Sequence, residues 1–165
     1  MADSDFEALI SLGAKIGERL TARGEMVGVA ESSAGGLISA ALLAVPGASH
    51  YFRGAGVIYT HEARRGLLEV TDAELEGVRP STEPYIAALA RGIKRRLETP
   101  WVLAESGATG PTGNRYGDAP GHACYAVLGP GVARTHTLET GDDDRVANMF
   151  RFARTGLEQL DAALS

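Results

Sequence analysis

Hydroxyl and glycine residues follow a short apolar run near the start of this 165-residue chain. The run Met26-Val27-Gly28-Val29 leads directly into Ala30-Glu31-Ser32-Ser33-Ala34-Gly35-Gly36, and an apolar stretch then begins at Leu37. This order predicts a strand, a tight loop and a helix, with a serine at the N-terminus of the helix. Free backbone N–H groups and the positive end of the helix dipole favour anions and oxyanions at such a position. The alternative is that Ser32 or Ser33 simply caps the helix.

Two further tracts have a similar order. Gly54-Ala55-Gly56-Val57-Ile58-Tyr59-Thr60-His61-Glu62-Ala63-Arg64 runs from a strand-like segment into a helix, and Ser106-Gly107-Ala108-Thr109-Gly110-Pro111-Thr112-Gly113 leaves an apolar run as a glycine-rich loop. Open α/β sheets bind ligands at the carboxyl ends of their strands. We therefore expect Ser32 at that edge of the sheet, close to Tyr59 and Ser106.

The three tracts, in this order and at this spacing, resemble the C-terminal domain of the CinA (competence/damage-inducible) family, whose stand-alone members are nicotinamide-nucleotide amidohydrolases. The first tract is similar to the family's A-E-S-C-T-G-G, the second to G-x-V-x-Y-S-N-E-A-K and the third to S/T-G-I-A-G-P-x-G-G. Val45-Pro46-Gly47-Ala48-Ser49 also resembles the family's V-P-G-S-S. Each motif alone is weak, but their ordered combination is specific and extends from the first helix to about Asp142.

The resemblance implies serine-dependent deamidation of nicotinamide mononucleotide or a related carboxamide. Ser32 matches the serine that attacks the carboxamide, Tyr59 the family's tyrosine, and Arg64 the position of a lysine thought to activate the serine. The implied substrate-binding positions are Ser33, Gly35, Gly36, Glu105, Ser106, Gly107, Gly110, Pro111 and Gly113. The ligand implied is a small pyridine nucleotide or a similar anionic molecule. No cofactor is implied, and a homo-oligomer, such as a dimer, is expected.

Several positions depart from the family pattern. Arg64 replaces the lysine, and arginine keeps its proton at any working pH, so it cannot act as a general base. The segment 118–121 reads D-A-P-G where the family has K-P-V-G, and 141–143 reads G-D-D where it has G-D-R, so Asp118 and Asp143 would oppose an anion. Glu105 occupies a position that is normally apolar. These changes predict a retained scaffold with an altered site.

Loss of the lysine leaves the general base open, because a hydroxyl is a poor nucleophile until a base acts on it. Glu31, His61, Glu62 and Glu105 are substitute candidates, and His61 has the side chain best suited to the task. However, His61 could equally be a solvated residue at a helix start.

The departures at Arg64 and Glu105 have a possible joint explanation. A buried carboxylate is costly unless it is paired, so one hypothesis joins Arg64 and Glu105 at the floor of the cleft. The alternative places Glu105 in solvent at the strand end. Two functions therefore stay open: an amidohydrolase with a different base, or an inactive protein that retains a nucleotide-binding cleft.

Composition favours one globular domain over residues 1–165, since 44% of the chain is hydrophobic and 22% is charged. A net charge of −5 argues against nucleic acid as a partner. No apolar run reaches the roughly 20 residues of a membrane span, and the acidic N-terminus is unlike a signal peptide, so a cytoplasmic location is expected. The only cysteine, Cys124, is predicted to be a small core residue, and the four scattered histidines predict no metal site.

Periodicity predicts alternating helices and strands. The predicted helices cover residues 4–22, 36–45, 62–68 and 81–97, with a last helix after 141–142, and the predicted strands cover 26–31, 56–60, 101–105, 122–128 and 134–140. Such alternation is typical of a layered α/β fold. Together with the family resemblance it predicts a three-layer α/β/α sandwich with a mixed, mainly parallel sheet.

Overall fold

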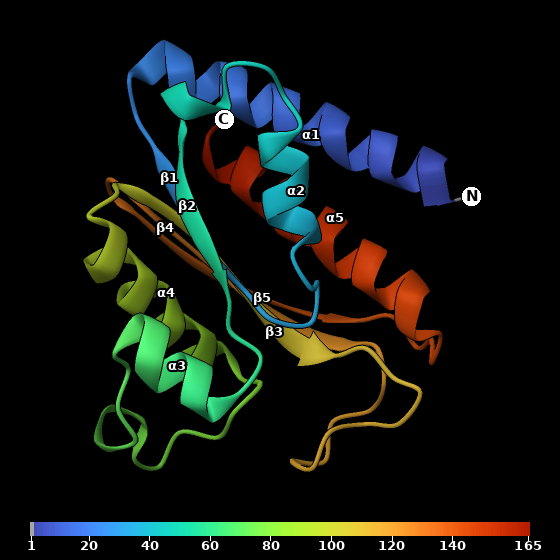
Figure 1. Cartoon of the computed structure of the whole chain (residues 1–165). Helices are drawn as coiled ribbons and strands as arrows, with labels where there is room; N and C mark the ends of the chain where they lie inside the picture. Colours follow the sequence, from blue (N-terminus) through green and yellow to red (C-terminus); the bar gives the residue numbers. More distant parts are fainter. Residues whose placement is uncertain (1) are drawn as a thin grey trace.

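A computed structural model describes residues 2–165 and contains a five-stranded sheet (Figure 1). The strands are β1 (Val27–Glu31), β2 (Phe52–Val57), β3 (Trp101–Ala108), β4 (His122–Gly129) and β5 (Val132–Glu139), in the spatial order β2-β1-β3-β4-β5. β1 pairs in parallel with β2 and β3, whereas β4 is antiparallel to β3 and β5. Strand β4 therefore runs against the other four, which confirms the predicted mixed sheet.

Helices cover both faces of this sheet (Figure 1). One face packs against α1 (Ala2–Arg23), α2 (Leu37–Leu43) and α5 (Arg145–Ala163), and the other against α3 (His61–Leu68) and α4 (Glu83–Leu97). Two short 3₁₀ turns, Ala48–His50 and Ala73–Leu75, lie in the connections. Within residues 2–165 no helix combines the length and the apolar character needed to cross a membrane.

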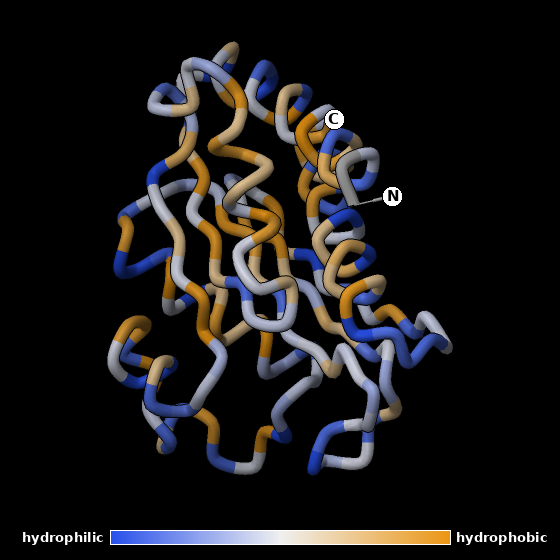
Figure 2. Tube along the Cα trace, turned by 45° about the vertical axis from the view of Figure 1, so that its right-hand side comes forward, coloured by the Kyte–Doolittle hydropathy of each residue, from blue (hydrophilic) through white to orange (hydrophobic). Residues whose placement is uncertain are grey.

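Strand alternation divides the core between the two faces. Successive side chains of a strand point to opposite faces, and along β3 Trp101 and Leu103 join the core under α1, α2 and α5, whereas Val102 and Ala104 join the core under α4. The central strands are largely hydrophobic in Figure 2. By the same alternation Glu105 is directed toward α2 and α5.

The second tract pairs differently from the prediction. A strand was expected over 56–60, but β2 spans 52–57, because Gly54 and Gly56 pair with Gly28 and Ala30 of β1. The predicted strand was wrong at both ends. Glycine has a low strand propensity, so the sequence around Gly54 and Gly56 did not indicate where the strand begins. Tyr59 consequently lies in the loop after the strand.

Candidate functional site

A cleft of about 390 Å³ opens at the carboxyl edge of the sheet, where all three tracts meet. In Figure 1 strands β1, β2 and β3 all run downward, so that their carboxyl ends lie at the same edge of the sheet. The lining residues are Ser32, Ile58, Tyr59, Thr60, His61, Glu62, Pro80, Ser81, Tyr85, Ser106, Gly107, Arg115 and Tyr116. Ser32, Tyr59 and Ser106 thus share one cleft, as the motif order predicts.

Glu31, the last residue of β1, organises the loop that carries Ser32. Its buried carboxylate accepts hydrogen bonds from the backbone N–H groups of Gly36, Ile38 and Ser39 at 2.8, 3.2 and 2.9 Å, and also contacts the Ser39 hydroxyl. These are the amides that the start of α2 leaves unpaired. The cap of α2 is therefore Glu31, and the alternative in which Ser32 or Ser33 caps the helix is wrong.

Glu105 binds the same loop through two of its backbone N–H groups. Its Oε2 accepts hydrogen bonds from the N–H groups of Ser32 at 2.9 Å and Ala34 at 3.0 Å, and the side chain is fully buried. Burial raises the pKa of Glu105 to about 7; the two amides oppose this increase and the neighbouring Glu31 adds to it. Glu105 was predicted to bind substrate, but it has no exposed surface and binds the Ser32 loop instead.

Strand register explains why the two carboxylates are neighbours. Ala30 of β1 pairs with Ala104 of β3, so that Glu31 and Glu105 follow at adjacent positions. Together their oxygens occupy five amides of the first tract and the start of α2. The anion site expected from free N–H groups at this helix start is therefore filled by the protein's own carboxylates.

Ser33 links the first tract to the third rather than lining the cleft. Its Oγ donates to the carbonyl oxygen of Gly107 at 2.6 Å and accepts from the Gly107 N–H at 2.8 Å. A Cβ on Gly107 would lie 2.3 Å from the backbone oxygen of His122, so no larger residue fits there. This reciprocal pair fixes Ser32 and Ser106 relative to each other.

Arg64 does not meet Glu105. The Arg64 guanidinium is buried, forms an ion pair with Asp72 and lies beside Tyr85, and it is not among the residues that line the cleft. The predicted Arg64–Glu105 pair is wrong because α3 packs on one face of the sheet, whereas Glu105 points toward the helices on the other. The solvent-exposed alternative for Glu105 is wrong as well.

The comparisons agree with this geometry. The family model for the CinA C-terminal domain matches residues 9–164. The chain belongs to the CinA C-terminal domain family. A CinA-like protein of Gloeobacter violaceus is 36% identical over 138 residues, which are 84% of this chain and 32% of that protein. A CinA-like protein of Desulforapulum autotrophicum is 31% identical over 151 residues, 92% of this chain and 36% of that protein. The chain spans about a third of the length of these relatives.

Solved CinA structures share the fold. A CinA superfamily protein from Klebsiella pneumoniae superposes with a TM-score of 0.88 at 26% identity, covering 94% of this chain and 97% of that one. A competence or damage-inducible protein from Enterobacter asburiae gives a TM-score of 0.88 at 29% identity, with 95% and 98% covered. The predicted three-layer fold is therefore confirmed as that of the CinA superfamily.

One arginine beside the cleft was not predicted from the CinA motifs. The third position of the G-D-R motif is Asp143 here, but Arg145 lies two residues later and donates to the Gly110 carbonyl at 2.7 Å and to the Tyr59 hydroxyl at 3.4 Å. Tyr59 itself is 65% exposed. A search of the residues just beyond the motif for a displaced arginine would have found it.

Five further positions predicted to bind substrate do not contribute to the surface of the cleft. Gly35, Gly36, Gly110, Pro111 and Gly113 are not among the residues that line it. Gly110 has φ 111°, and a Cβ there would lie 2.4 Å from the backbone oxygen of Asp143. The tip of the glycine loop after β3 supplies Arg115 and Tyr116 to the cleft, and neither was predicted.

Asp118 does not act as the free negative charge that its motif position suggested. Arg79 binds both of its oxygens, at 2.8 and 3.1 Å, and the Asn114 side-chain amide donates to it at 2.8 Å. Burial acts to raise the pKa of Asp118, but its hydrogen bonds to Arg79 and Asn114, together with the charges of His122 and Arg79, lower it overall. Its charge is thus compensated within the protein.

Proposed function

We propose that this CinA-family protein is a serine-dependent amidohydrolase of low turnover, acting on the carboxamide of nicotinamide mononucleotide or a related anionic ligand. The observation that carries the proposal is the meeting of Ser32, Ser106 and His61 in one cleft of about 390 Å³, with Arg115 at the same cleft. A guanidinium is well suited to bind a phosphate or carboxylate.

His61 is the proposed general base, since it is the imidazole that lines the cleft. Ser32 Oγ would form a bond to the carboxamide carbon while its proton passes to His61. The C–N bond then breaks as the imidazolium returns that proton to the departing nitrogen, which leaves as ammonia. Water would then lose a proton to His61 and attack the acyl carbon. The bond from this carbon to Ser32 Oγ breaks as the imidazolium returns the proton to Ser32, and the acid product leaves.

Low turnover is expected because neither Arg64 nor Glu105 can take the proton from the Ser32 hydroxyl. Arg64 retains its proton and is engaged by Asp72, and Glu105 contacts Ser32 through the backbone N–H rather than through the hydroxyl. A positioned general base contributes about 100- to 10,000-fold. We therefore expect turnover below that of lysine-bearing relatives, but by less than this full factor, because His61 would take over part of the role of the lysine.

A second candidate function is ligand binding without hydrolysis. The Arg64–Asp72 ion pair favours it, because the position of the activating lysine is used here for a buried structural contact. The cleft would then retain its ligand unchanged. A homo-oligomeric state, a cytoplasmic location and a single domain over residues 1–165 are further proposals from the family resemblance.

Ammonia release from nicotinamide mononucleotide, measured together with calorimetric binding of the same compound, separates the two functions. Slow release that Ser32→Ala abolishes supports the hydrolase, and His61→Gln should reduce it at least tenfold. The matched control is Ser11→Ala, at an exposed serine of α1 outside the cleft. Binding without release would support the second function, and absence of both would contradict each of them.

A further inference from the structure

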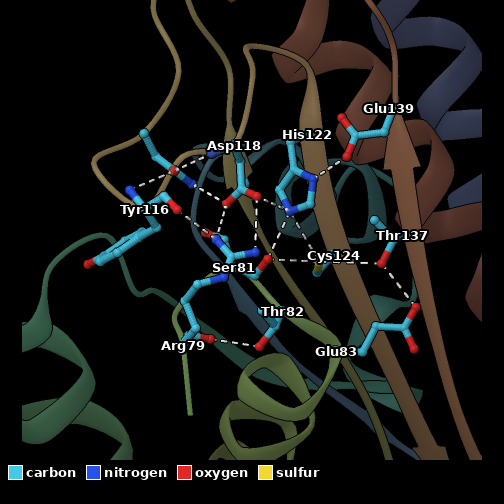
Figure 3. A network of polar contacts seen from close by, with 12 residues as sticks. Arg79, Ser81, Thr82, Glu83, Tyr116, Asp118, His122, Cys124, Thr137 and Glu139 are labelled. Atoms are coloured by element: carbon cyan, nitrogen blue, oxygen red, sulfur yellow. Dashed lines mark hydrogen bonds and ion pairs between the residues drawn. The ribbon is translucent and has the colours of Figure 1, made fainter. Parts of the chain in front are cut away.

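His122 is a buried histidine at the start of β4, behind the wall of the cleft (Figure 3). Its Nε2 lies 2.8 Å from the carbonyl oxygen of Ser81, and its Nδ1 contacts a carboxylate oxygen of Glu139 on β5. A carbonyl and a carboxylate can only accept hydrogen bonds, whereas a neutral imidazole has a single N–H to donate. Both contacts together therefore require the imidazolium form of His122.

The charges around His122 favour this form. Glu139 faces the ring from β5, and Asp118 Oδ1 lies 3.7 Å from Nε2. Arg79 also binds this carboxylate, through both of its oxygens. Burial lowers the pKa of His122, but the hydrogen bonds to Glu139 and Ser81 and the charge of Asp118 raise it, and the net direction is upward.

Two further titratable groups belong to the same network, Cys124 on β4 itself and Glu83 on α4. The Cys124 thiol lies 3.6 Å from Nε2, and burial raises the pKa of this thiol, so that it adds no charge. On α4, Glu83 accepts hydrogen bonds from Thr135 and Thr137 of β5, and its carboxylate is satisfied there. Neither group competes with Glu139 and Asp118 for the charge on His122.

Ser81 connects the charged His122 ring to the cleft. It lines the cleft and has φ 58°, a left-handed conformation that is uncommon for a residue other than glycine. Such a conformation persists only where the surroundings impose it. Its carbonyl accepts from His122 and, at 3.3 Å, from the Cys124 thiol. His122 is thus the charged donor that holds Ser81.

The same hydrogen-bond network also includes loop 114–118, which supplies Tyr116 to the cleft wall. Arg79 binds Asp118 with both guanidinium nitrogens and donates to the carbonyl oxygen of Tyr116 at 3.2 Å (Figure 3). The Tyr116 hydroxyl lies 3.1 Å from His61 Nε2, and both residues line the cleft. Segment 79–82 and loop 114–118 are thereby joined around His122.

We propose that the imidazolium of His122 is a positioning group for the cleft wall, and that loss of its second proton at alkaline pH releases Ser81 and weakens ligand binding. Glu139 would retain the proton on Nδ1 through a charge-assisted bond, so Nε2 is the site that deprotonates. Its lone pair would then face the lone pairs of the Ser81 carbonyl. The effect on ligand binding rests on the proposed function of the cleft.

Long-range ¹H–¹⁵N NMR of the histidine rings between pH 5 and 10 tests the charge state. Because its folded pKa is raised, His122 should remain doubly protonated above pH 6.5. The backbone amides of Ser81 and Tyr116 should shift with its titration, and that of Ser81 should shift with no other histidine. In Glu139→Gln, which changes a largely exposed side chain, the midpoint should fall by about 1 pH unit. A singly protonated ring at pH 6, or amides that ignore the titration, would overturn the proposal.

Calorimetry with nicotinamide mononucleotide at pH 7 and pH 9.5 tests the effect on binding. Between pH 7 and pH 9.5 wild type should lose at least threefold more affinity than His122→Gln, because the other titratable groups that line the cleft are the same in both proteins. Equal pH dependence in the two proteins would refute the coupling. If neither protein binds the nucleotide, the function proposed for the cleft fails, while the NMR titration of Ser81 still decides the role of His122.

Discussion

Replacement of Glu105 by glutamine tests the electrostatics beneath the Ser32 loop. Glutamine keeps an oxygen that can accept from the N–H groups of Ser32 and Ala34, and its –NH₂ replaces Oε1, which has no partner among the described residues. A protonated Glu105 leaves a comparable buried O–H without an acceptor. The two proteins should therefore be equally stable, to within about 1 kcal/mol, below pH 4.5, where Glu105 is neutral in both the folded and the unfolded chain.

The direction in which wild-type stability changes with pH follows from the raised pKa of Glu105. Between the ordinary value of 4.5 and about 7 in the folded protein, the folded state binds more protons than the unfolded chain, so wild-type stability falls as pH rises. This difference corresponds to about 3 kcal/mol, since each pH unit is worth about 1.4 kcal/mol. Glu105→Gln should thus match wild type at pH 4 and exceed it by about 3 kcal/mol at pH 8.5.

Urea unfolding of both proteins at intervals from pH 4 to 9 measures this difference, and other titrating groups cancel in the comparison. At pH 8.5 the midpoint of thermal unfolding should be about 6 to 12 °C higher in the variant. Glu76→Gln, at an exposed position, is the matched control and should show no such trend. A constant difference between Glu105→Gln and wild type across the whole range would refute a carboxyl that becomes neutral near pH 7.

Two further predictions concern the third tract and the position of the missing lysine. Gly107→Ala should destabilise the fold by about 1 to 3 kcal/mol in urea unfolding, because the new Cβ would meet the backbone of β4. The control Gly66→Ala, in open space on α3, should stabilise the fold by up to about 1 kcal/mol. Equal effects of the two substitutions would contradict the close approach of Gly107 to β4. Arg64→Lys alone should raise ammonia release less than tenfold, since Asp72 would hold the lysine in its charged form. Arg64→Lys combined with Asp72→Asn should raise ammonia release further. Equal release by the single and double variants would exclude Asp72 as the group that keeps the lysine charged.

The meeting of the three tracts could be predicted from the sequence, and the reason is geometric. Each tract follows an apolar run, and parallel strands bring their carboxyl ends to one edge of a sheet. The placement of Ser32 directly after β1, and of Ser106 near the end of β3, follows from this rule. The burial of Cys124 within β4 was also correctly predicted, because its neighbours form an unbroken apolar run.

The contacts of charged residues could not be predicted in the same way. The Arg64–Glu105 pair was inferred from two coincident departures from the family motifs, but strand alternation places Glu105 on the face away from α3. Nothing in the local sequence marks Asp72 as the partner of Arg64 or Arg79 as the partner of Asp118. Such pairs depend on how loops fold back over the sheet, and sequence spacing carries little information about that.

The filled amides of the first tract have a consequence for the orientation of a ligand. Glu31 and Glu105 occupy the N–H groups around Ser32, so these amides are not free to bind an anionic group of the ligand. Arg115 supplies positive charge at the same cleft from loop 114–118, where the charge of Asp118 is compensated by Arg79. Under the proposed function, the uncharged carboxamide would therefore face Ser32 and the anionic end of the nucleotide would face Arg115.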